Sequence, residues 1–312
     1  MSEKTKNRLG WTAVILTTII AGIWALWGSV ENFHEGWYFE SFIRNIGLMF
    51  LQYLSLTMIF IILSSISLRL PRVGGSLFIG FGLYLCFFFF NRITFTTVVM
   101  ITIPFTILGL FYWFGRPRPR RLAYAVIIGV PLLIILVSSI PNAIRVSKRV
   151  NDGNFDARIV TGNGVTLVWA PEGPGWPEKG VTWYDAKEIC SHLSEDGTTV
   201  TDSVLNIWRL PTVDEAVRSM ARHGKNAGGV WNKTAKKAEY KITPDKETPL
   251  WNVHSMVIYW WTATEADSEK AYIVTYNGGV WPRLKTRCPG YLAFRAVKKL
   301  NKISILSETE SK

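Results

Sequence analysis

Long apolar runs fill the first half of the chain, whereas short runs broken by turn-forming residues fill the second. A run of about 20 apolar residues is long enough to cross a lipid bilayer as a helix. The pattern therefore predicts a transmembrane domain over residues 1–141 with five helical spans, at about 11–30, 43–68, 74–90, 93–114 and 122–141. Residues 142–157 are predicted to be a linker, residues 158–300 a folded domain, and residues 301–312 a frayed tail.

The first apolar run follows a short basic segment, so a cleavable signal peptide is an alternative to a retained span. We favour the span because Trp24 and Trp27 stand at its far end, as is typical of a membrane interface. The run also lacks the small-x-small pattern of a cleavage site.

Basic residues orient the spans, because cytoplasmic loops carry an excess of lysine and arginine. With five crossings and a cytoplasmic N-terminus, the outer loops between spans carry only Arg44 and Arg92. The cytoplasmic side then holds nine basic residues: Lys4, Lys6, Arg8, Arg69, Arg72, Arg116, Arg118, Arg120 and Arg121. The glycine-rich run at 74–90 also suits a re-entrant segment, but that arrangement would export the cluster at 116–121. Five crossings place the folded domain outside the cytoplasm, in a multi-pass cell-membrane protein.

The folded domain is predicted to contain two helices. Apolar residues recur at helical spacing over Tyr184–Leu193, which predicts an amphipathic helix with Thr182 as its N-cap. A second helix is predicted to open after Pro211, where Thr212 and Glu215 have the spacing of a capping box.

Strands are predicted on both sides of these helices. Five β-rich runs are bounded by turn-forming residues, at 158–160, 165–169, 256–262, 271–276 and 293–297. Asn277-Gly278 predicts a tight hairpin turn, and residues 224–254 are predicted to form a long loop. The pattern indicates an α+β domain in which the first and last strands are neighbours.

Composition agrees with this division. The chain of 312 residues has 48% hydrophobic residues, and only four of its 23 acidic residues precede residue 142. After that point 24 basic and 19 acidic residues leave a net charge of about +5, which suits an anionic surface or partner. Because the domain is predicted to be exported, we expect no nucleic-acid partner.

Four motifs carry a family resemblance over residues 160–300. They are VTWYDAKEIC at 181–190, WRLPTVDEA at 208–216, YWWTATE at 259–265 and AFRAVKK at 293–299. Their order and spacing resemble the Lcl C-terminal domain family and the formylglycine-generating, sulfatase-modifying family. The resemblance implies a C-type-lectin-like fold, with these structural motif residues: Trp183, Arg209, Leu210, Pro211, Thr212, Glu215 and Arg295.

The cysteines test two implications of this resemblance. In the lectin-like fold a cysteine at the end of the first helix pairs with one in the last strand, and here Ala296 stands at that second position. A disulfide between Cys190 and Cys288 therefore stays an open alternative. The formylglycine-generating enzymes are implied to bind copper through paired cysteines near the C-terminus, where this chain has only Cys288. We accordingly predict no catalytic residue, metal site or cofactor.

Candidate binding residues lie in two predicted loops, 224–254 and 278–289. Trp231, Trp251 and Trp281 stand in or beside these loops, where aromatic rings form platforms for ligands. Core packing is the alternative for tryptophans, and we expect it for Trp183, Trp208 and Trp260. The neighbouring polar candidates are Asn252, His254 and Arg283.

Calcium-dependent sugar binding is a weaker interpretation of the first loop. Glu247-Thr248-Pro249 and Asn252 resemble the lectin calcium chemistry, but no carboxylate follows Asn252.

Three functions are consistent with these observations. The leading hypothesis is a membrane-anchored, non-enzymatic recognition module that binds a ligand or extracytoplasmic protein partner, with carbohydrate as one candidate ligand. The alternative is an accessory or structural subunit of a larger membrane complex. An oxidase of the formylglycine-generating type is third. Transport is disfavoured because the spans contain almost no ionisable residues that would line a path.

Overall fold

The computed structural model describes residues 1–89 and 94–300, and it forms two compact units, Met1–Val146 and Ser147–Lys312. Each unit has its own hydrophobic core. The predicted turn at Asn91-Arg92 and the predicted tail at 301–312 lie outside the described residues.

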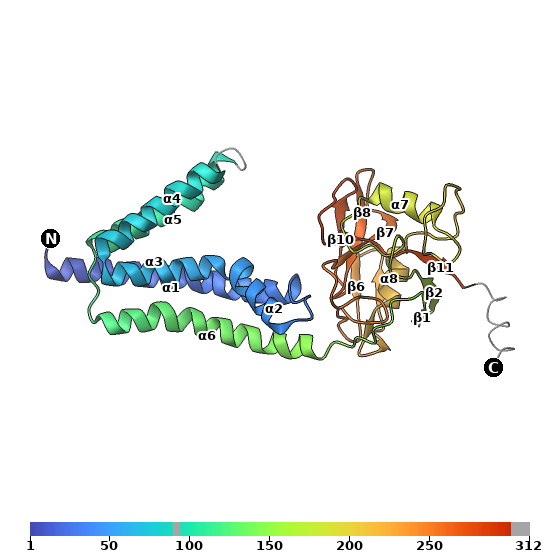
Figure 1. The fold of residues 1–312 in the computed structure, drawn as a ribbon, viewed down its shortest axis with the longest axis horizontal. Helices are drawn as coiled ribbons and strands as arrows, with labels where there is room; N and C mark the ends of the chain where they lie inside the picture. Colours follow the sequence, from blue (N-terminus) through green and yellow to red (C-terminus); the bar gives the residue numbers. More distant parts are fainter. Residues whose placement is uncertain (90–93, 301–312) are drawn as a thin grey trace. The chain divides into compact units, whose positions relative to one another are not determined.

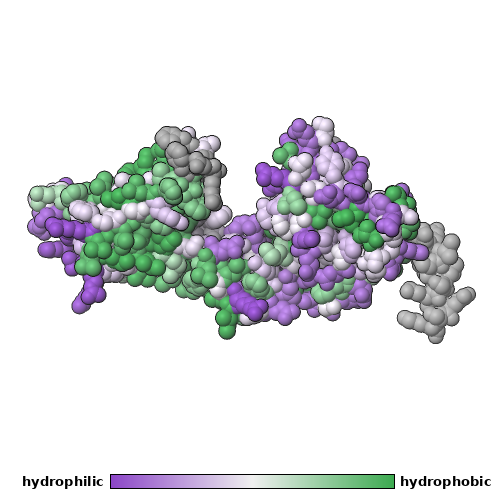
Figure 2. Space-filling view, turned by 45° about the horizontal axis from the view of Figure 1, so that its top comes forward, coloured by the Kyte–Doolittle hydropathy of each residue, from purple (hydrophilic) through white to green (hydrophobic). Residues whose placement is uncertain are grey.

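The first unit is helical (Figure 1). Its elements are α1 (Glu3–His34), α2 (Phe42–Leu48), the π-helical turn η1 (Met49–Tyr53), α3 (Ser55–Arg69), α4 (Pro71–Phe89), α5 (Phe95–Phe114) and α6 (Arg120–Ser147). Among the described residues, α1, α4 and α6 are long and apolar enough to cross a membrane, and the bent pair α2–α3 would make a fourth span. The described segment Thr102–Phe114 of α5 is a shorter apolar helix. Figure 2 shows a largely hydrophobic surface over this unit, which indicates membrane association.

The second predicted span is not one straight helix. α2–η1 and α3 meet at an angle of 68°, and the break falls at Leu54. The Leu54 amide bonds back to the Met49 carbonyl at 2.8 Å, which is the i to i−5 pattern of a π-turn. The bend packs directly against Gly28 of α1, where a Cβ would lie 2.3 Å from the Tyr53 carbonyl oxygen. A glycine lets α1 approach this bend closely.

Aromatic side chains and close glycine contacts pack the helical unit. Phe60, Phe78, Phe105 and Tyr112 form a continuous buried cluster between α3, α4 and α5. α4 and α5 run side by side, and a Cβ at Gly75 would lie 2.7 Å from the Gly109 carbonyl oxygen. Small residues allow this approach of two backbones.

The second unit contains two helices and eleven strands in its described residues. The helices are α7 (Trp183–His192) and α8 (Val213–Ser219). The strands are β1 (Arg158–Gly162), β2 (Val165–Trp169), β3 (Ala221–Arg222), β4 (Lys225–Asn226), β5 (Val230–Asn232), β6 (Lys237–Glu239), β7 (Tyr259–Glu265), β8 (Lys270–Thr275), β9 (Val280–Leu284), β10 (Leu292–Ala293) and β11 (Val297–Lys299).

These strands form two main sheets and two short hairpins. The sheet β1-β2-β11 brings the first and last strands of the unit together, as predicted, because β11 pairs antiparallel with β2. The second sheet has the order β10-β7-β8-β9, and the hairpins are β3–β4 and β5–β6. A helical half followed by a β-rich half is therefore confirmed.

Local signals in the sequence predicted the caps and one turn correctly. Thr182 caps α7 by accepting the Asp185 amide at 3.2 Å, and Thr212 caps α8 with Glu215 in a capping box. Asn277-Gly278 joins β8 to β9 as a hairpin, and Gly278 has the positive φ of +86° that such turns require.

Two expectations for the second unit were wrong. The predicted strand at 293–297 is divided between β10 and β11, which belong to different sheets. The chain crosses between the sheets at Phe294–Ala296, where the buried Arg295 bonds to main-chain carbonyls. The predicted long loop at 224–254 contains the β5–β6 hairpin, and its polar composition hid these short strands.

Tryptophans fill the core of this unit. Trp183, Trp208 and Trp260 are buried, which confirms the core role expected for them. Trp169 also packs against Trp260, with ring centroids 5.5 Å apart.

Candidate functional site

The site is built on the loop that carries the WRLPT motif. Trp208 is buried, and its indole N–H donates to the Ser194 carbonyl at 2.8 Å. The backbone of Arg209 exchanges two hydrogen bonds with Val297 of β11, at 3.0 and 2.8 Å. These contacts attach the loop to the closing strand, so that Thr212 begins α8 at a defined position.

Glu215 joins the cap of α8 to Arg209. Its carboxylate accepts the Thr212 amide at 2.8 Å and two guanidinium hydrogen bonds from Arg209, at 2.7 and 2.6 Å. Burial by itself raises the pKa of Glu215, but the hydrogen bonds from Arg209 and Thr212 outweigh it and hold the pKa below its ordinary value. The carboxylate is therefore charged and holds the scaffold together.

A groove of about 450 Å³ opens beside this cap. It lies among the first turn of α8, the β5–β6 hairpin and the strands β7 and β8. Its lining residues are Thr212, Val213, Asp214, Trp231, Lys233, Lys236, Thr264 and Tyr272.

Aromatic rings form one wall of this groove. Trp231 is partly exposed and packs edge-on against Tyr272, with ring centroids 5.7 Å apart. The exposed Lys233 and Lys236 come from the hairpin turn, and Asp214 forms an ion pair with Arg218 at 2.8 Å. The groove thus combines a flat apolar surface with two lysines and a carboxylate that already has a cationic partner.

These groups suit binding. An indole and a phenol ring offer contact area to a flat ligand face, and lysines attract anionic groups. The hydroxyls of Thr212 and Thr264 accept the amides of Glu215 and Val213, at 3.2 and 3.0 Å, and so take part in the scaffold. Within residues 1–89 and 94–300, no three His, Cys, Asp or Glu side chains lie together as metal ligands would.

Of the six predicted binding residues, only Trp231 lines this groove. Trp251 was expected on the surface but is 2% exposed, and its ring stacks on Trp260 with centroids 3.6 Å apart and 10° between planes. The expectation for Trp251 was wrong because the preceding buried segment, Asp245–Thr248, draws the chain into the core.

The other predicted binding residues lie at two separate places. Asn252 is buried and accepts the His254 amide at 2.8 Å, while the His254 side chain is exposed. On β9, Arg283 is exposed, and Trp281 is partly buried against Tyr259, with ring centroids 6.1 Å apart. The structure does not assemble these residues into one site with Trp231.

Glu247, the carboxylate considered for calcium binding, points into the protein close to a second buried carboxylate, that of Asp245. Asp245 accepts two hydrogen bonds from Arg149, at 3.0 and 2.8 Å, and lies 2.8 Å from the guanidinium of Arg222. Glu247 accepts the Val150 amide at 3.1 Å and is fully buried. Both carboxylates therefore balance buried arginines, which leaves them unsuited to a surface calcium ion.

Cys190 and Cys288 are both free thiols in the structure. Cys190 lies on the buried face of α7, whereas Cys288 is exposed after β9. The disulfide considered between them is not formed, because the two side chains occupy these different environments. Burial raises the pKa of the Cys190 thiol, so this residue stays protonated and packs as an apolar group.

Sequence reasoning missed most of the groove. Lys233, Lys236, Asp214 and Tyr272 were not among the predicted binding residues, although Trp231 was. The segment Val230–Glu239 does carry a signal, since two short strands with an exposed turn of small and basic residues are consistent with a hairpin.

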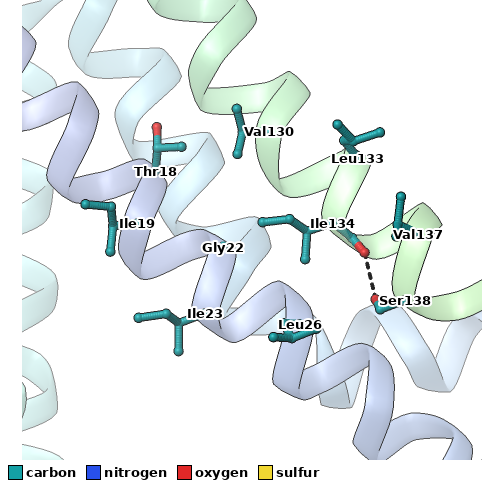
Figure 3. Close-up of a pocket in the computed structure, with 10 residues that line it drawn as sticks. All are labelled: Thr18, Ile19, Gly22, Ile23, Leu26, Val130, Leu133, Ile134, Val137 and Ser138. Carbon is teal, nitrogen blue, oxygen red and sulfur yellow. Dashed lines mark hydrogen bonds between the residues drawn. The ribbon is translucent and has the colours of Figure 1, made fainter.

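The helical unit has an apolar groove of about 720 Å³ between α1 and α6 (Figure 3). Ile19, Ile23 and Leu26 line it from α1, and Leu133 and Val137 line it from α6. Figure 3 shows Ile134 of α6 directed toward Gly22 of α1. The hydroxyls at its edges bond to carbonyls of their own helices, as Ser138 does to Ile134 at 2.7 Å. This surface offers hydrophobic contact and no polar recognition.

Comparison with protein families gives a match to part of the first unit. A family model described as a domain of unknown function, DUF7670, matches residues 1–125, which comprise α1 to α5 and the start of α6. No curated protein matches the chain. The similarity to DUF7670 thus covers helices of the first unit, and its description assigns no function.

Proposed function

We propose that the protein is a membrane-anchored recognition protein whose C-terminal domain binds an anionic ligand in the groove beside Trp231. The composition of that groove is the observation that carries the proposal, because it combines the Trp231 and Tyr272 rings with Lys233 and Lys236. The ligand that fits is an acidic oligosaccharide or an acidic segment of an extracytoplasmic protein partner. The engaged hydroxyls of Thr212 and Thr264 favour binding over catalysis.

Five membrane crossings are part of this proposal. Four come from α1, α4, α6 and the bent α2–α3 pair, each by length and composition. The close contact of Gly75 with Gly109 supports the fifth, since α5 then returns along α4. An odd number of crossings puts the N-terminus and the C-terminal domain on opposite sides. The basic cluster at 116–121 favours the cytoplasm for the N-terminus.

The C-type-lectin-like fold of the Lcl and formylglycine-generating families is also part of the proposal. Its support is the position of the four motifs: α7, the α8 cap, β7 and the β10–β11 crossing. The pairing of β11 with β2 and the placement of both helices before the β7–β9 strands agree with the resemblance.

Protease protection tests the topology. Protease added to sealed, right-side-out vesicles should remove the C-terminal domain and leave the loop at 116–119 intact. Cleavage at the arginine loop with protection of the domain would overturn the proposed orientation.

A binding assay tests the groove. Purified full-length protein in detergent is applied to arrays of acidic oligosaccharides and acidic peptides. We expect Trp231→Ala to weaken binding about tenfold or more, because a central aromatic contact is worth about 2 kcal/mol. The double variant Lys233→Gln, Lys236→Gln should also bind more weakly than wild type, and this loss of affinity should be larger at low salt than at high salt. Lys237→Gln is the matched control, since Lys237 lies on the same hairpin but outside the groove.

Equal binding by the wild type and the Trp231→Ala variant would place the binding site elsewhere. No binding to any acidic probe, with the domain folded, would count against the recognition function itself.

A role as an accessory subunit of a membrane complex is the second candidate. One face of α4 favours it, because Ser76, Gly80, Tyr84 and Phe87 follow at helical spacing and are exposed, with Phe87 85% exposed. Small residues four apart are typical of helix pairing in membranes. A stoichiometric partner that copurifies in mild detergent, and is lost from Gly80→Leu, would favour this function.

A further inference from the structure

A polar cavity of about 450 Å³ lies at the end of the helical unit where α1 begins. Four segments meet there: the start of α1, the start of α4, the end of α5, and the loop that leads into α6. Their charged residues at the cavity are Glu3, Lys6, Arg72, Arg116, Arg118 and Arg120.

Main-chain hydrogen bonds hold the arginine-bearing loop against α1. The Arg116 amide donates to the Lys6 carbonyl at 2.8 Å, and the Arg118 amide donates to the Asn7 side-chain oxygen at 2.7 Å. The indole N–H of Trp11 donates to the Arg118 carbonyl at 3.0 Å. The loop is thus fixed to a helix more than 100 residues earlier in the chain, so its arginines are held in a defined arrangement.

Two glycines make this attachment tight. A Cβ at Gly115 would lie 2.6 Å from the Gly10 amide nitrogen, and a Cβ at Gly10 would lie 2.4 Å from the Pro117 nitrogen. Real side chains do not tolerate such distances, so glycine is required on both sides of the contact.

The charges around the cavity are unbalanced. Five cationic side chains face one carboxylate, that of Glu3, which lies 2.7 Å from Lys6 and 3.7 Å from Arg118. Burial lowers the pKa of Arg116, and the positive charges of Arg120 and Arg72 lower it further. The Arg116 guanidinium is held by neutral acceptors, the carbonyls of Trp113 and Gly115, at 3.1 and 2.6 Å. A bound anion would relieve this repulsion.

We propose that this cavity binds the phosphate group of an anionic phospholipid. Arginines pair with phosphate through two parallel hydrogen bonds, and several converging arginines favour a phosphate over a single carboxylate. The place also suits a lipid, because α4 and α6 begin and α5 ends here, at the level where headgroups lie. Trp113 and Phe114, which line the cavity, are typical of a membrane interface. Soluble phosphate compounds share this chemistry and are the other source to be tested.

Native mass spectrometry of the full-length protein, delipidated in detergent, tests the proposal. Phosphatidylglycerol, phosphatidylcholine and inorganic phosphate are added separately, and the bound fraction of each is measured. We expect phosphatidylglycerol to bind at least tenfold more tightly than phosphatidylcholine. Arg72→Gln combined with Arg120→Gln should remove about tenfold or more of that affinity, because the phosphate loses its charge-assisted hydrogen bonds to both guanidinium groups.

The variants are chosen to keep the fold. The bonds that fix the loop come from the amides of Arg116 and Arg118 and from Trp11, so changing Arg72 and Arg120 leaves them in place. Arg121→Gln is the matched control, because Arg121 is exposed in the same first turn of α6 but does not line the cavity. We expect its affinity to stay within about twofold of wild type.

Each outcome decides the proposal. If the two lipids bind equally, the proposed site is wrong. It is also wrong if the double variant and the Arg121→Gln control lose the same amount of phosphatidylglycerol affinity. Binding of inorganic phosphate that depends on Arg72 and Arg120, without preference for phosphatidylglycerol, overturns the lipid as its source.

Discussion

Arg295 provides a direct test of what holds the C-terminal domain together. It is fully buried at the crossing between β10 and β11. Its guanidinium donates to three main-chain carbonyls: those of Ala170 at 2.8 Å, Pro249 at 2.9 Å and Leu250 at 2.7 Å. Its Cζ atom lies 3.6 Å from the ring centroid of Trp176. One side chain thus joins the residue that follows β2, the loop before β7 and the crossing between the closing strands.

We expect Arg295→Ala to lower the free energy of unfolding by about 3–5 kcal/mol, because it leaves three carbonyls in the core without their donor. Each of the three carbonyls left without a donor costs about 1–3 kcal/mol, and loss of the contact with Trp176 costs about 2 kcal/mol more. Relief of desolvation offsets several kcal/mol of this sum. That desolvation is evident in the folded protein, where burial lowers the pKa of Arg295 well below its ordinary value.

Thermal unfolding of the full-length protein in detergent, followed by tryptophan fluorescence and by protease resistance of the domain, measures the change. A loss of this size should lower the midpoint of the domain's transition by about 10 °C. Arg287→Ala is the control, because Arg287 is exposed, and its effect should stay within about 0.5 kcal/mol. A loss below about 1 kcal/mol for Arg295→Ala would refute the reasoning, since the three carbonyls would then have found other donors.

Three further predictions follow from the caps, the charges and the helix contacts. Thr212→Ala should destabilise the C-terminal domain by about 1 kcal/mol and Thr212→Ser by much less, as measured by urea unfolding, because only the hydroxyl serves the cap. The hydrogen bonds from Arg209 and Thr212 hold the pKa of Glu215 below its ordinary value of 4.5, although burial opposes them. The contribution of Glu215 to the free energy of unfolding should therefore be complete above pH 4.5 and be lost as the pH falls below that value. Glu215→Gln should reduce this acid-dependent loss of stability. Gly75→Val should lower the thermal stability of the helical unit, because its Cβ would meet the Gly109 carbonyl, whereas Gly129→Val should not, since a Cβ there meets nothing within 4 Å.

The sequence predicted features that depend on neighbouring residues. Thr182, Thr212 and Glu215 act as caps because the partners lie three residues away, and Asn277-Gly278 turns because glycine adopts a positive φ. The apolar runs predicted helices for the same reason, since hydrophobicity over about 20 residues is a local property.

Features that depend on distant partners were missed. Trp251 and Glu247 have the composition of a surface loop, yet Trp251 stacks on Trp260 and Glu247 accepts the Val150 amide 97 residues earlier. The bend at Leu54 likewise depends on Gly28 of another helix. Such contacts have no signature within the segment itself, which is why burial of these residues was not predicted.

The motif residues make structural contacts within the C-terminal domain, whereas Trp231 and the two groove lysines lie at its surface. Trp183 donates its indole N–H to the Thr262 carbonyl at 2.8 Å, Arg209 pairs with Glu215, and Arg295 bonds to three carbonyls. The motif residues that carry the family resemblance therefore hold the scaffold. Trp231 and the two groove lysines come from the β5–β6 hairpin, which lies between the WRLPT and YWWTATE motifs and outside both. On the proposed function, a protein with the same scaffold but a different hairpin should bind a different ligand, because the groove residues Trp231, Lys233 and Lys236 come from residues 230–239 and not from the motifs. Exchange of this hairpin between such proteins should exchange their ligands while leaving the stability of the scaffold unchanged.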